Sequence, residues 1–259
     1  PRISQIAPQK PLFLKAKLMW TKEFPLEMVK IPFLEKEKHQ YFCGDGHEYM
    51  SVSSILSKVK PKFDLEGKAL ECALRKKVSV DEILKSWDDK KKTGLDYGTD
   101  VHENVEKYFL NGEILNEKYT QVVKDIRDMV YSENGYNELI CFDKNKKICG
   151  TSDYVEFAEG FFNISDFKTN IKFNFENQYN DKFLLEPVSH LPNSEYFIYA
   201  LQLSFYAYMI EKLTNSKCGF LNIYWLKRQI DTKHVFKAKW MRYTVPFLKK
   251  EVEDILCIV

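Results

Sequence analysis

The sequence predicts a mixed α/β fold, in which helices flank a central β-sheet and a helical extension precedes it. Three observations favour this class. Helical patterns recur along the chain between residues 51 and 133. Alternating strand patterns follow between residues 138 and 169. An apolar helix pattern then precedes two more strand patterns, and this order is typical of one sheet packed between helices.

The composition of the 259-residue chain suits a protein with a substantial core. Hydrophobic residues make up 44% and charged residues 29%, and the net charge of +2 neither requires nor excludes a nucleic-acid partner. No C-x-x-C pair occurs among the six cysteines, and scattered thiols suit a reducing, cytoplasmic compartment. The longest apolar stretch is shorter than the roughly 20 residues of a membrane span, so no membrane partner is expected.

The N-terminal half begins with residues 1–40, which we expect to be mostly irregular. A short hairpin is predicted around residues 44–46, and the next helix begins at a serine cap near Ser51. Ser79 is predicted to cap a further helix, with Glu82 three residues on. The helices expected in this half are Lys68–Lys77, Ser79–Thr93, Asp100–Asn111 and Glu117–Glu133.

The C-terminal half is predicted to supply most of the sheet. Residues 170–195 are expected to form a long connection, and the apolar helix after it is expected to be buried. The strands expected are Glu138–Phe142, Ile148–Ala158, Phe161–Thr169, Phe220–Leu226 and Lys239–Val245, and the helices are Tyr196–Leu213 and Pro246–Leu256.

The hairpin predicted over residues 148–169 places two carboxylates opposite each other. With a two-residue Glu-Gly loop at residues 159–160, facing residues have numbers that sum to 319, so Asp153 faces Asp166. Facing side chains have Cβ atoms roughly 5 Å apart, and like charges at that separation repel each other. The pattern therefore predicts a cation between the two carboxylates.

Three residues of this hairpin form a candidate metal site with Asp153. Lys168 lies two residues beyond Asp166 and projects from the same face of the sheet. Mg²⁺ takes oxygen ligands, which the two aspartates and the carbonyl of Phe167 supply. Lys168 is then placed to act on a metal-bound water or on a phosphate oxygen. The alternative is a surface pair in which Lys168 only neutralises Asp166.

Two helix patterns add further candidates. His102 and Glu106 are four residues apart and share a helix face, and an imidazole suits Mn²⁺ as well as Mg²⁺; the alternative is a surface pair. Tyr199, Gln202 and Tyr206 lie on one face of the apolar helix. Gln202 then reaches the lysine, a water or a nucleic-acid backbone, or it is a core amide satisfied among packing tyrosines.

Basic and aromatic clusters are the fourth group of candidates. Lysines neutralise phosphates and aromatic rings stack on bases, which is how single strands are held; the alternative is a set of solvated turns and loop anchors. The basic clusters are Lys90–Lys92, Lys144/Lys146/Lys147, Lys227/Arg228 and Lys233/Lys237/Lys239, and the aromatic residues are Phe173, Phe175, Tyr179 and Phe183.

In their order and spacing, four motifs resemble the RecB-type exonuclease branch of the PD-(D/E)xK nuclease superfamily. The resemblance covers roughly residues 98–226. Residues 49–56 and Trp87 resemble the helical lead-in of phage-encoded members and of the mitochondrial genome maintenance exonuclease. The motifs are G-x-x-x-H at Gly98–His102, G-x-x-D at Gly150–Asp153, D-x-K at Asp166–Lys168 and Q-x-x-x-Y at Gln202–Tyr206.

The resemblance implies a restriction-endonuclease-like core over residues 98–259, with residues 1–97 as a hairpin and helical lead-in packed on it. It implies a Mg²⁺- or Mn²⁺-dependent DNA nuclease, an exonuclease acting on single strands or free ends in replication, recombination or repair. The implied metal ligands are His102, Asp153, Asp166, the Phe167 carbonyl and, at a less regular family position, Glu106; Lys168 is the implied catalytic lysine, supported by Gln202 and Tyr206.

Several expectations about partners follow from the resemblance. Only Cys218 and Cys257 lie after the core motifs, so no iron–sulfur cluster is expected. No P-loop motif occurs, so a helicase or recombination partner would be a separate chain in a bacterial or phage-infected cell. The alternatives are a catalytically inactive nucleic-acid-binding module with a nuclease-like core, and a metal-dependent hydrolase that is not a nuclease.

Overall fold

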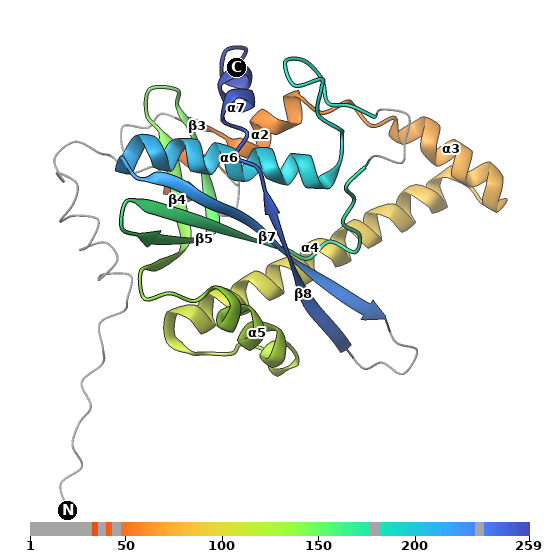
Figure 1. Cartoon of the computed structure of the whole chain (residues 1–259). Helices are drawn as coiled ribbons and strands as arrows, with labels where there is room; N and C mark the ends of the chain where they lie inside the picture. Colours follow the sequence, from red (N-terminus) through yellow and green to blue (C-terminus); the bar gives the residue numbers. More distant parts are fainter. Residues whose placement is uncertain (1–32, 36–39, 43–47, 177–181, 231–235) are drawn as a thin grey trace, which may run out of the picture.

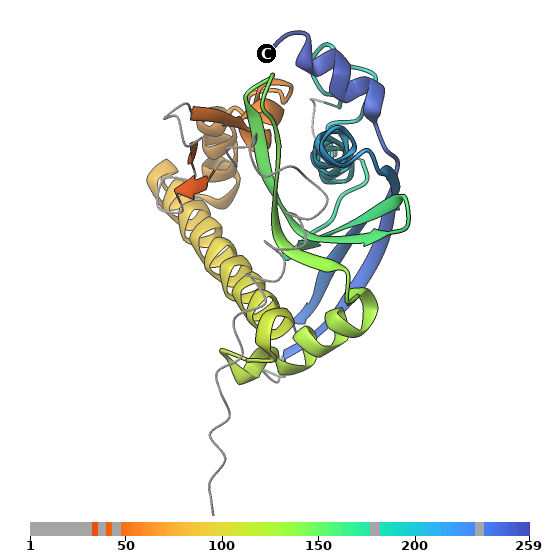
Figure 2. The same cartoon turned by 90° about the vertical axis from the view of Figure 1, so that its left-hand side faces the viewer.

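A central mixed β-sheet lies between helices on both of its faces, so the predicted α/β class is confirmed (Figures 1 and 2). The computed structural model of the chain describes residues 33–35, 40–42, 48–176, 182–230 and 236–259. Tyr179, Lys233 and the turn predicted at residues 44–46 lie outside these ranges. Within them, no helix is both long and apolar enough to cross a membrane.

The sheet has the strand order β1-β2-β3-β5-β6-β7-β8, and β4 pairs with β5 away from this path. Two pairs of adjacent strands are parallel, namely β3 with β5 and β6 with β7. The other pairs are antiparallel. The strands are β1 (Phe33–Glu35), β2 (Gln40–Phe42), β3 (Glu48–Ser51), β4 (Gly135–Asp143), β5 (Ile148–Ala158), β6 (Phe161–Lys168), β7 (Lys217–Ile230) and β8 (Phe236–Val245).

The helices begin where the sequence supplies caps. Ser51 and Ser79 accept hydrogen bonds from the backbone N–H groups three residues on, which confirms both predicted caps. Ser79 and Glu82 complete a capping box. The helices are α2 (Val52–Lys58), α3 (Leu65–Lys76), α4 (Val80–Asn111), the 3₁₀-helix η1 (Glu117–Tyr119), α5 (Thr120–Val130), α6 (Glu195–Thr214) and α7 (Lys249–Leu256).

Two apolar clusters hold the helices on the two faces of the sheet. On one face α6 is buried, as predicted, and packs with α2 and α7 around residues such as Leu201 and Phe205. On the other face α5 and the second half of α4 pack on Phe167 and Trp240. Since side chains alternate along a strand, Asp166 and Lys168 point towards the α6 face. The candidate residues of β6 therefore lie under α6.

The two helices predicted at residues 79–93 and 100–111 are one helix, α4, so that prediction was wrong. Gly94 and Gly98 do not break it, because an isolated glycine costs a helix only about 1 kcal/mol and tertiary packing on both halves exceeds that. The boundary predicted between residues 97 and 98 falls within α4, and the division of the chain at that point stays a prediction.

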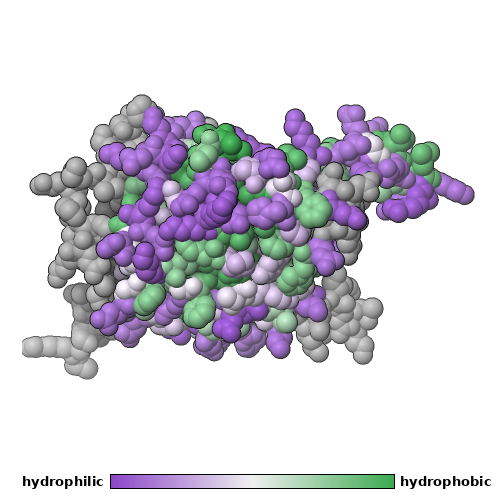
Figure 3. Space-filling view, turned by 45° about the horizontal axis from the view of Figure 1, so that its top comes forward, coloured by the Kyte–Doolittle hydropathy of each residue, from purple (hydrophilic) through white to green (hydrophobic). Residues whose placement is uncertain are grey.

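The first half of α4 forms an arm with α3 that projects from the body (Figures 1 and 3). Ala69 and Ala73 of α3 pack against Ile83 of α4, and their small side chains allow the two helices to lie close together. Leu74 on the outer side of α3 is 72% exposed, and Figure 3 shows hydrophobic residues among the hydrophilic ones there. Among the described residues, the arm is held mainly by its own helix–helix contact.

Several element boundaries differ from the predictions because strand pairing extends them. β7 and β8 are longer than predicted, since they pair along ten residue positions of each strand. β4 begins three residues earlier than predicted, where it pairs with the end of β5. The helix predicted from Glu117 begins with η1 and continues as α5 from Thr120. β1 lies in the region predicted to be irregular, because its short strand gains regularity only by pairing with β2.

The register of the β5–β6 hairpin is the predicted one. Five pairs from Ala158–Phe161 to Tyr154–Ser165 have numbers that sum to 319. Gly160 has φ +73°, so the turn needs the positive φ that glycine supplies. The described ladder ends at the pair Tyr154–Ser165, one position short of the pair predicted between Asp153 and Asp166.

Gly150 allows α6 to approach β5 closely. A Cβ atom at Gly150 would lie 2.6 Å from Cε1 of Tyr206, whereas a Cβ at Gly94 would meet nothing within 4 Å. We therefore expect Gly150→Ala to lower the free energy of unfolding by about 1–3 kcal/mol. The control Gly94→Ala, inside a helix, should raise it by about 0.5–1 kcal/mol. Urea denaturation measures both, and a neutral Gly150→Ala would contradict the close packing.

Candidate active site

The candidate site lies where β6 and β3 share one edge of β5. β6 pairs with the C-terminal half of β5, up to Tyr154, and β3 pairs with its start, at Ile148 and Cys149. Between these two ladders, the described residues Gly150–Ser152 have a strand partner only on the other edge, where β4 lies. On its other edge β6 pairs with β7 from Phe161 to Lys168, so the end of β6 stays in the sheet while its edge towards β5, at this fork between the ladders, is open to side chains from α4 and α6.

Asp153 and His102 meet at the backbone of Phe167. The N–H of Phe167 donates to Oδ2 of Asp153 at 2.6 Å, and its carbonyl accepts from Nε2 of His102 at 2.9 Å. The other imidazole nitrogen, Nδ1, lies 3.6 Å from Oδ1 of Asp153. His102 therefore reaches both strands from α4. Asp153 reaches across the fork to β6 through its side chain instead of a backbone ladder.

A third residue, Glu138, completes the group that the structure brings together. Ligand atoms of His102, Glu138 and Asp153 all lie within 4.8 Å of one another. Pairs on either side of Glu138 in the β4–β5 ladder have numbers that sum to 291, which places Glu138 opposite Asp153. Glu138 also has φ +49°, an uncommon backbone conformation for a residue with a side chain.

Sequence reasoning missed Glu138, because no local signal placed it opposite Asp153. The β4–β5 hairpin has no two-residue glycine turn that would set its register, so the pairing of Glu138 with Asp153 was not predictable in the way that the 319 register was. The two predicted side-chain ligands that lie outside the group of three are Asp166 and Glu106. Glu106 lies one turn beyond His102 along α4, and its role stays a prediction.

Asp166 forms a buried ion pair with Lys168. Oδ2 of Asp166 lies 2.5 Å from the Lys168 ammonium, and their side chains are 2% and 17% exposed. Burial raises the pKa of the Asp166 carboxyl, and Lys168 opposes that rise. Burial alone would lower the pKa of Lys168, but the carboxylates of Asp166 and Asp153 outweigh it and raise that pKa. Lys168 therefore stays an ammonium at neutral pH.

Two tyrosines of α6 cover the pair of Asp166 and Lys168. The Lys168 ammonium lies 4.7 Å from the ring centroid of Tyr199, a cation–π contact, and burial raises the pKa of Tyr199 to about 12. Burial, followed by the Asp166 carboxylate, raises the pKa of Tyr206. The Gln202 amide donates to the Tyr206 hydroxyl at 2.8 Å, so two residues of the predicted stripe are joined and the amide has a partner.

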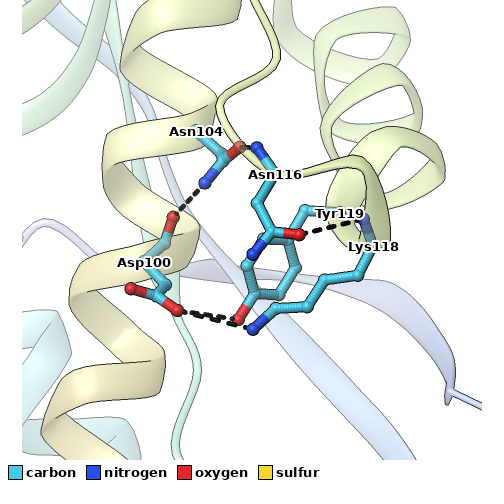
Figure 4. Close-up of polar contacts among 5 residues, drawn as sticks. All are labelled: Asp100, Asn104, Asn116, Lys118 and Tyr119. Carbon is cyan, nitrogen blue, oxygen red and sulfur yellow. Dashed lines mark hydrogen bonds and ion pairs between the residues drawn. The ribbon is translucent and has the colours of Figure 1, made fainter.

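A polar network anchors the segment of α4 that carries the candidate histidine (Figure 4). The buried amide of Asn104 donates to the Asp100 carbonyl at 2.7 Å, and its oxygen accepts from the Asn116 N–H at 2.9 Å. Lys118 and Tyr119 both reach Oδ2 of Asp100, at 3.5 and 3.4 Å. These contacts tie the helix to the turn before α5 and hold its orientation over the sheet.

We expect Asn104→Ala to lower the free energy of unfolding by about 1–3 kcal/mol, because it removes two hydrogen bonds made by a buried amide. Asp100→Asn serves as the control, since its carboxylate is half exposed and such surface contacts are worth less than about 1 kcal/mol. Equal losses in the two variants, measured by urea denaturation, would contradict the anchoring role of Asn104.

No protein-family model and no curated protein matches the sequence. Among solved structures, the chain is similar to a provisionally assigned exonuclease from Eubacterium rectale, with 14% sequence identity and a TM-score of 0.35. The match covers 81% of this chain and 77% of that one. A similarity of this size carries no argument, so the function is inferred from the residues of the site.

Proposed function

We propose that this protein is a metal-dependent DNA nuclease of the PD-(D/E)xK superfamily, in the RecB-type exonuclease branch. One observation carries the proposal: a three-residue group able to hold a metal ion and a buried carboxylate–lysine pair meet at Phe167. If Lys168 only neutralised Asp166 on a surface hairpin, we would expect this pair to be exposed and His102 not to contact the neighbouring Phe167. Residues of the four motifs, which are far apart in the sequence, thus lie close together in the fold.

The donor set fits a hard divalent cation. We propose His102, Glu138, Asp153 and the Phe167 carbonyl as ligands of Mg²⁺ or Mn²⁺, with Asp166 next to them. Opposite ligands of Mg²⁺ are about 4.2 Å apart, so a group spread over 4.8 Å needs only small side-chain movements. The bound ion supplies polarisation of a phosphate oxygen and a water of lowered pKa.

The lysine is proposed to act through its charge. Because the carboxylates of Asp166 and Asp153 keep Lys168 protonated, it neutralises negative charge that develops on the phosphate, and it does not serve as a base in this state. Asp166 orients the ammonium, and the ring of Tyr199 limits its movement. Tyr206, held by Gln202, packs over the same carboxylates and supports their position.

The setting of this activity is also a proposal. We place the nuclease in replication, recombination or repair, in the cytoplasm of a bacterial or phage-infected cell, with any helicase as a separate chain. Residues 1–97 would act as a lead-in to the core over residues 98–259. A catalytically inactive nucleic-acid-binding module is the alternative.

Digestion of matched linear and circular DNA, single- and double-stranded, tests the proposal. With Mg²⁺ or Mn²⁺ we expect linear substrates to be degraded and circular ones to persist, because an exonuclease needs an end. EDTA should abolish cleavage. Cleavage in EDTA would overturn the metal-dependent mechanism. Tight DNA binding without turnover in any divalent ion would favour the inactive binding module.

A further inference from the structure

The sheet surface next to Lys168 continues across β7 and β8. In the parallel β6–β7 pair Lys168 lies opposite Trp225, and in the β7–β8 pair Trp225 lies opposite Met241. Two residues further along, Lys227 lies opposite Lys239. Because side chains alternate along strands, all five project from the face that carries Lys168. The candidate lysine is thus the first of a row that leads to the outer edge of the sheet.

The pairing of Lys227 with Lys239 places two like charges opposite each other. Both side chains are exposed, and among the described residues neither has an acidic partner within ion-pair distance. Cross-strand like charges destabilise a sheet, and their Cβ atoms are roughly 5 Å apart. An anion between the two ammonium groups reverses the sign of this interaction. The pair is therefore suited to a phosphate.

An aromatic cluster lies on the other side of the row, around Tyr243. Phe173 stacks on Tyr243, with ring centroids 4.8 Å apart, and on Trp225 at 5.8 Å. Phe175 packs edge-on against Phe173 and Tyr243, both at 5.2 Å, and is 46% exposed. Phe173, by contrast, is only 9% exposed and supports the others. The cluster thus presents Phe175 at the surface on a fixed base.

The cluster is joined to the candidate site through Tyr199. The Phe173 ring stacks against the Tyr199 ring at 6.1 Å, and the Lys168 ammonium lies over the same Tyr199 ring. The Trp225 indole donates to the carbonyl of Asn170 at 2.7 Å, which fixes the segment that leaves β6. Tyr243 lies opposite Ile223, two residues before Trp225, whereas Lys227 lies two residues after it, so the aromatic cluster and the lysine pair flank the row on opposite sides of one face.

We propose that this surface, formed by Phe175, Tyr243, Met241, Lys227 and Lys239, binds the single-stranded part of a DNA substrate beside the scissile bond. The proposal rests on the nuclease function proposed above. A single strand is favoured over a duplex, because unpaired bases offer their faces to aromatic rings while their phosphates meet the lysines. Duplex DNA offers the phosphates alone.

Fluorescence anisotropy in EDTA tests the lysine pair without cleavage. A labelled thymidine oligonucleotide and a duplex of the same length serve as probes. For Lys227→Ala/Lys239→Ala we expect the slope of log K against log salt concentration to fall by about 1.4 for the single strand, since each phosphate contact contributes about 0.7. This corresponds to roughly 25-fold weaker binding at 0.1 M salt. The control Lys107→Ala/Lys124→Ala, exposed on α4 and α5, has the same charge change and should leave the slope unchanged.

Phe175→Ala tests the stacking. We expect single-strand binding to weaken roughly 5- to 150-fold, duplex binding to change little, and Phe175→Tyr to restore the affinity. The thermal midpoint of the double lysine variant should stay the same or rise, because a repulsive pair is removed. Loss of binding with a midpoint that does not fall assigns these lysines to the ligand.

Three results would overturn the proposal: unchanged single-strand binding in both variants, an equal loss of duplex binding in Phe175→Ala, or a slope change in the control as large as in the double variant. Its failure is separable from that of the nuclease function. If the wild type cleaves DNA with Mn²⁺ while the variants bind normally, only this surface is wrong. If the wild type never cleaves while the variants lose binding, the surface stands and the nuclease function fails.

Discussion

Lys168→Met is expected to lower the rate of DNA cleavage by roughly 100- to 1000-fold and to destabilise the protein. The rate falls because one preorganised charge next to the phosphate is lost. Stability falls by about 3–5 kcal/mol at neutral pH, because the Asp166 carboxylate remains, 2% exposed, without its counter-ion. Cleavage of labelled DNA and urea denaturation measure the two effects.

The pH dependence of this loss has a definite sign. Without Lys168, burial raises the pKa of Asp166 in the folded state above its unfolded value. The protonated carboxyl needs no counter-ion, so the destabilisation of Lys168→Met is smallest near pH 4 and grows as the pH rises towards neutrality. A destabilisation that shrinks over this range would contradict the buried ion pair.

The double variant Asp166→Asn/Lys168→Met separates the chemical role from the structural one. With both charges removed, no uncompensated charge is buried, and we expect most of the stability to return. Cleavage should not return, because neither the ammonium nor the carboxylate is restored. If the double variant regained activity together with stability, Lys168 would be a structural residue only.

Glu138→Gln is expected to weaken Mn²⁺ binding by at least 10- to 100-fold, whereas Glu106→Gln should leave it nearly unchanged. Glu138 lies in the group with His102 and Asp153, but Glu106 lies outside it. A change in residues that only support metal ligands already costs 10- to 100-fold, so loss of a ligand should cost at least as much. Isothermal titration calorimetry of the two variants measures the difference directly.

The same comparison has a second readout in stability. At a Mn²⁺ concentration 100 times its dissociation constant, the wild type should gain about 2.7 kcal/mol in the free energy of unfolding. Glu106→Gln should keep this gain and Glu138→Gln should lose most of it. The opposite order in the two variants would return the ligand role to Glu106 and remove the metal site inferred from the fork.

Local chemistry made much of the fold predictable from the sequence. The 319 register followed from a two-residue loop with Gly160, the start of α4 from the capping box at Ser79, and the burial of α6 from its apolar composition. Each of these depends on residues close together in the chain. The same reasoning failed at Gly94 and Gly98, since whether a helix survives a glycine depends on what packs against it.

The sequence by itself determined which residue types are available for chemistry: a histidine on a helix, two aspartates and a lysine on a hairpin, and a glutamine and tyrosines on a buried helix. Only the tertiary structure decided which of them meet. It placed Glu138 with His102 and Asp153, and it buried the pair of Asp166 and Lys168 under α6. The physical reason is that these contacts join β4, β5, β6 and α4, whose approach depends on strand pairing and core packing over long sequence separations.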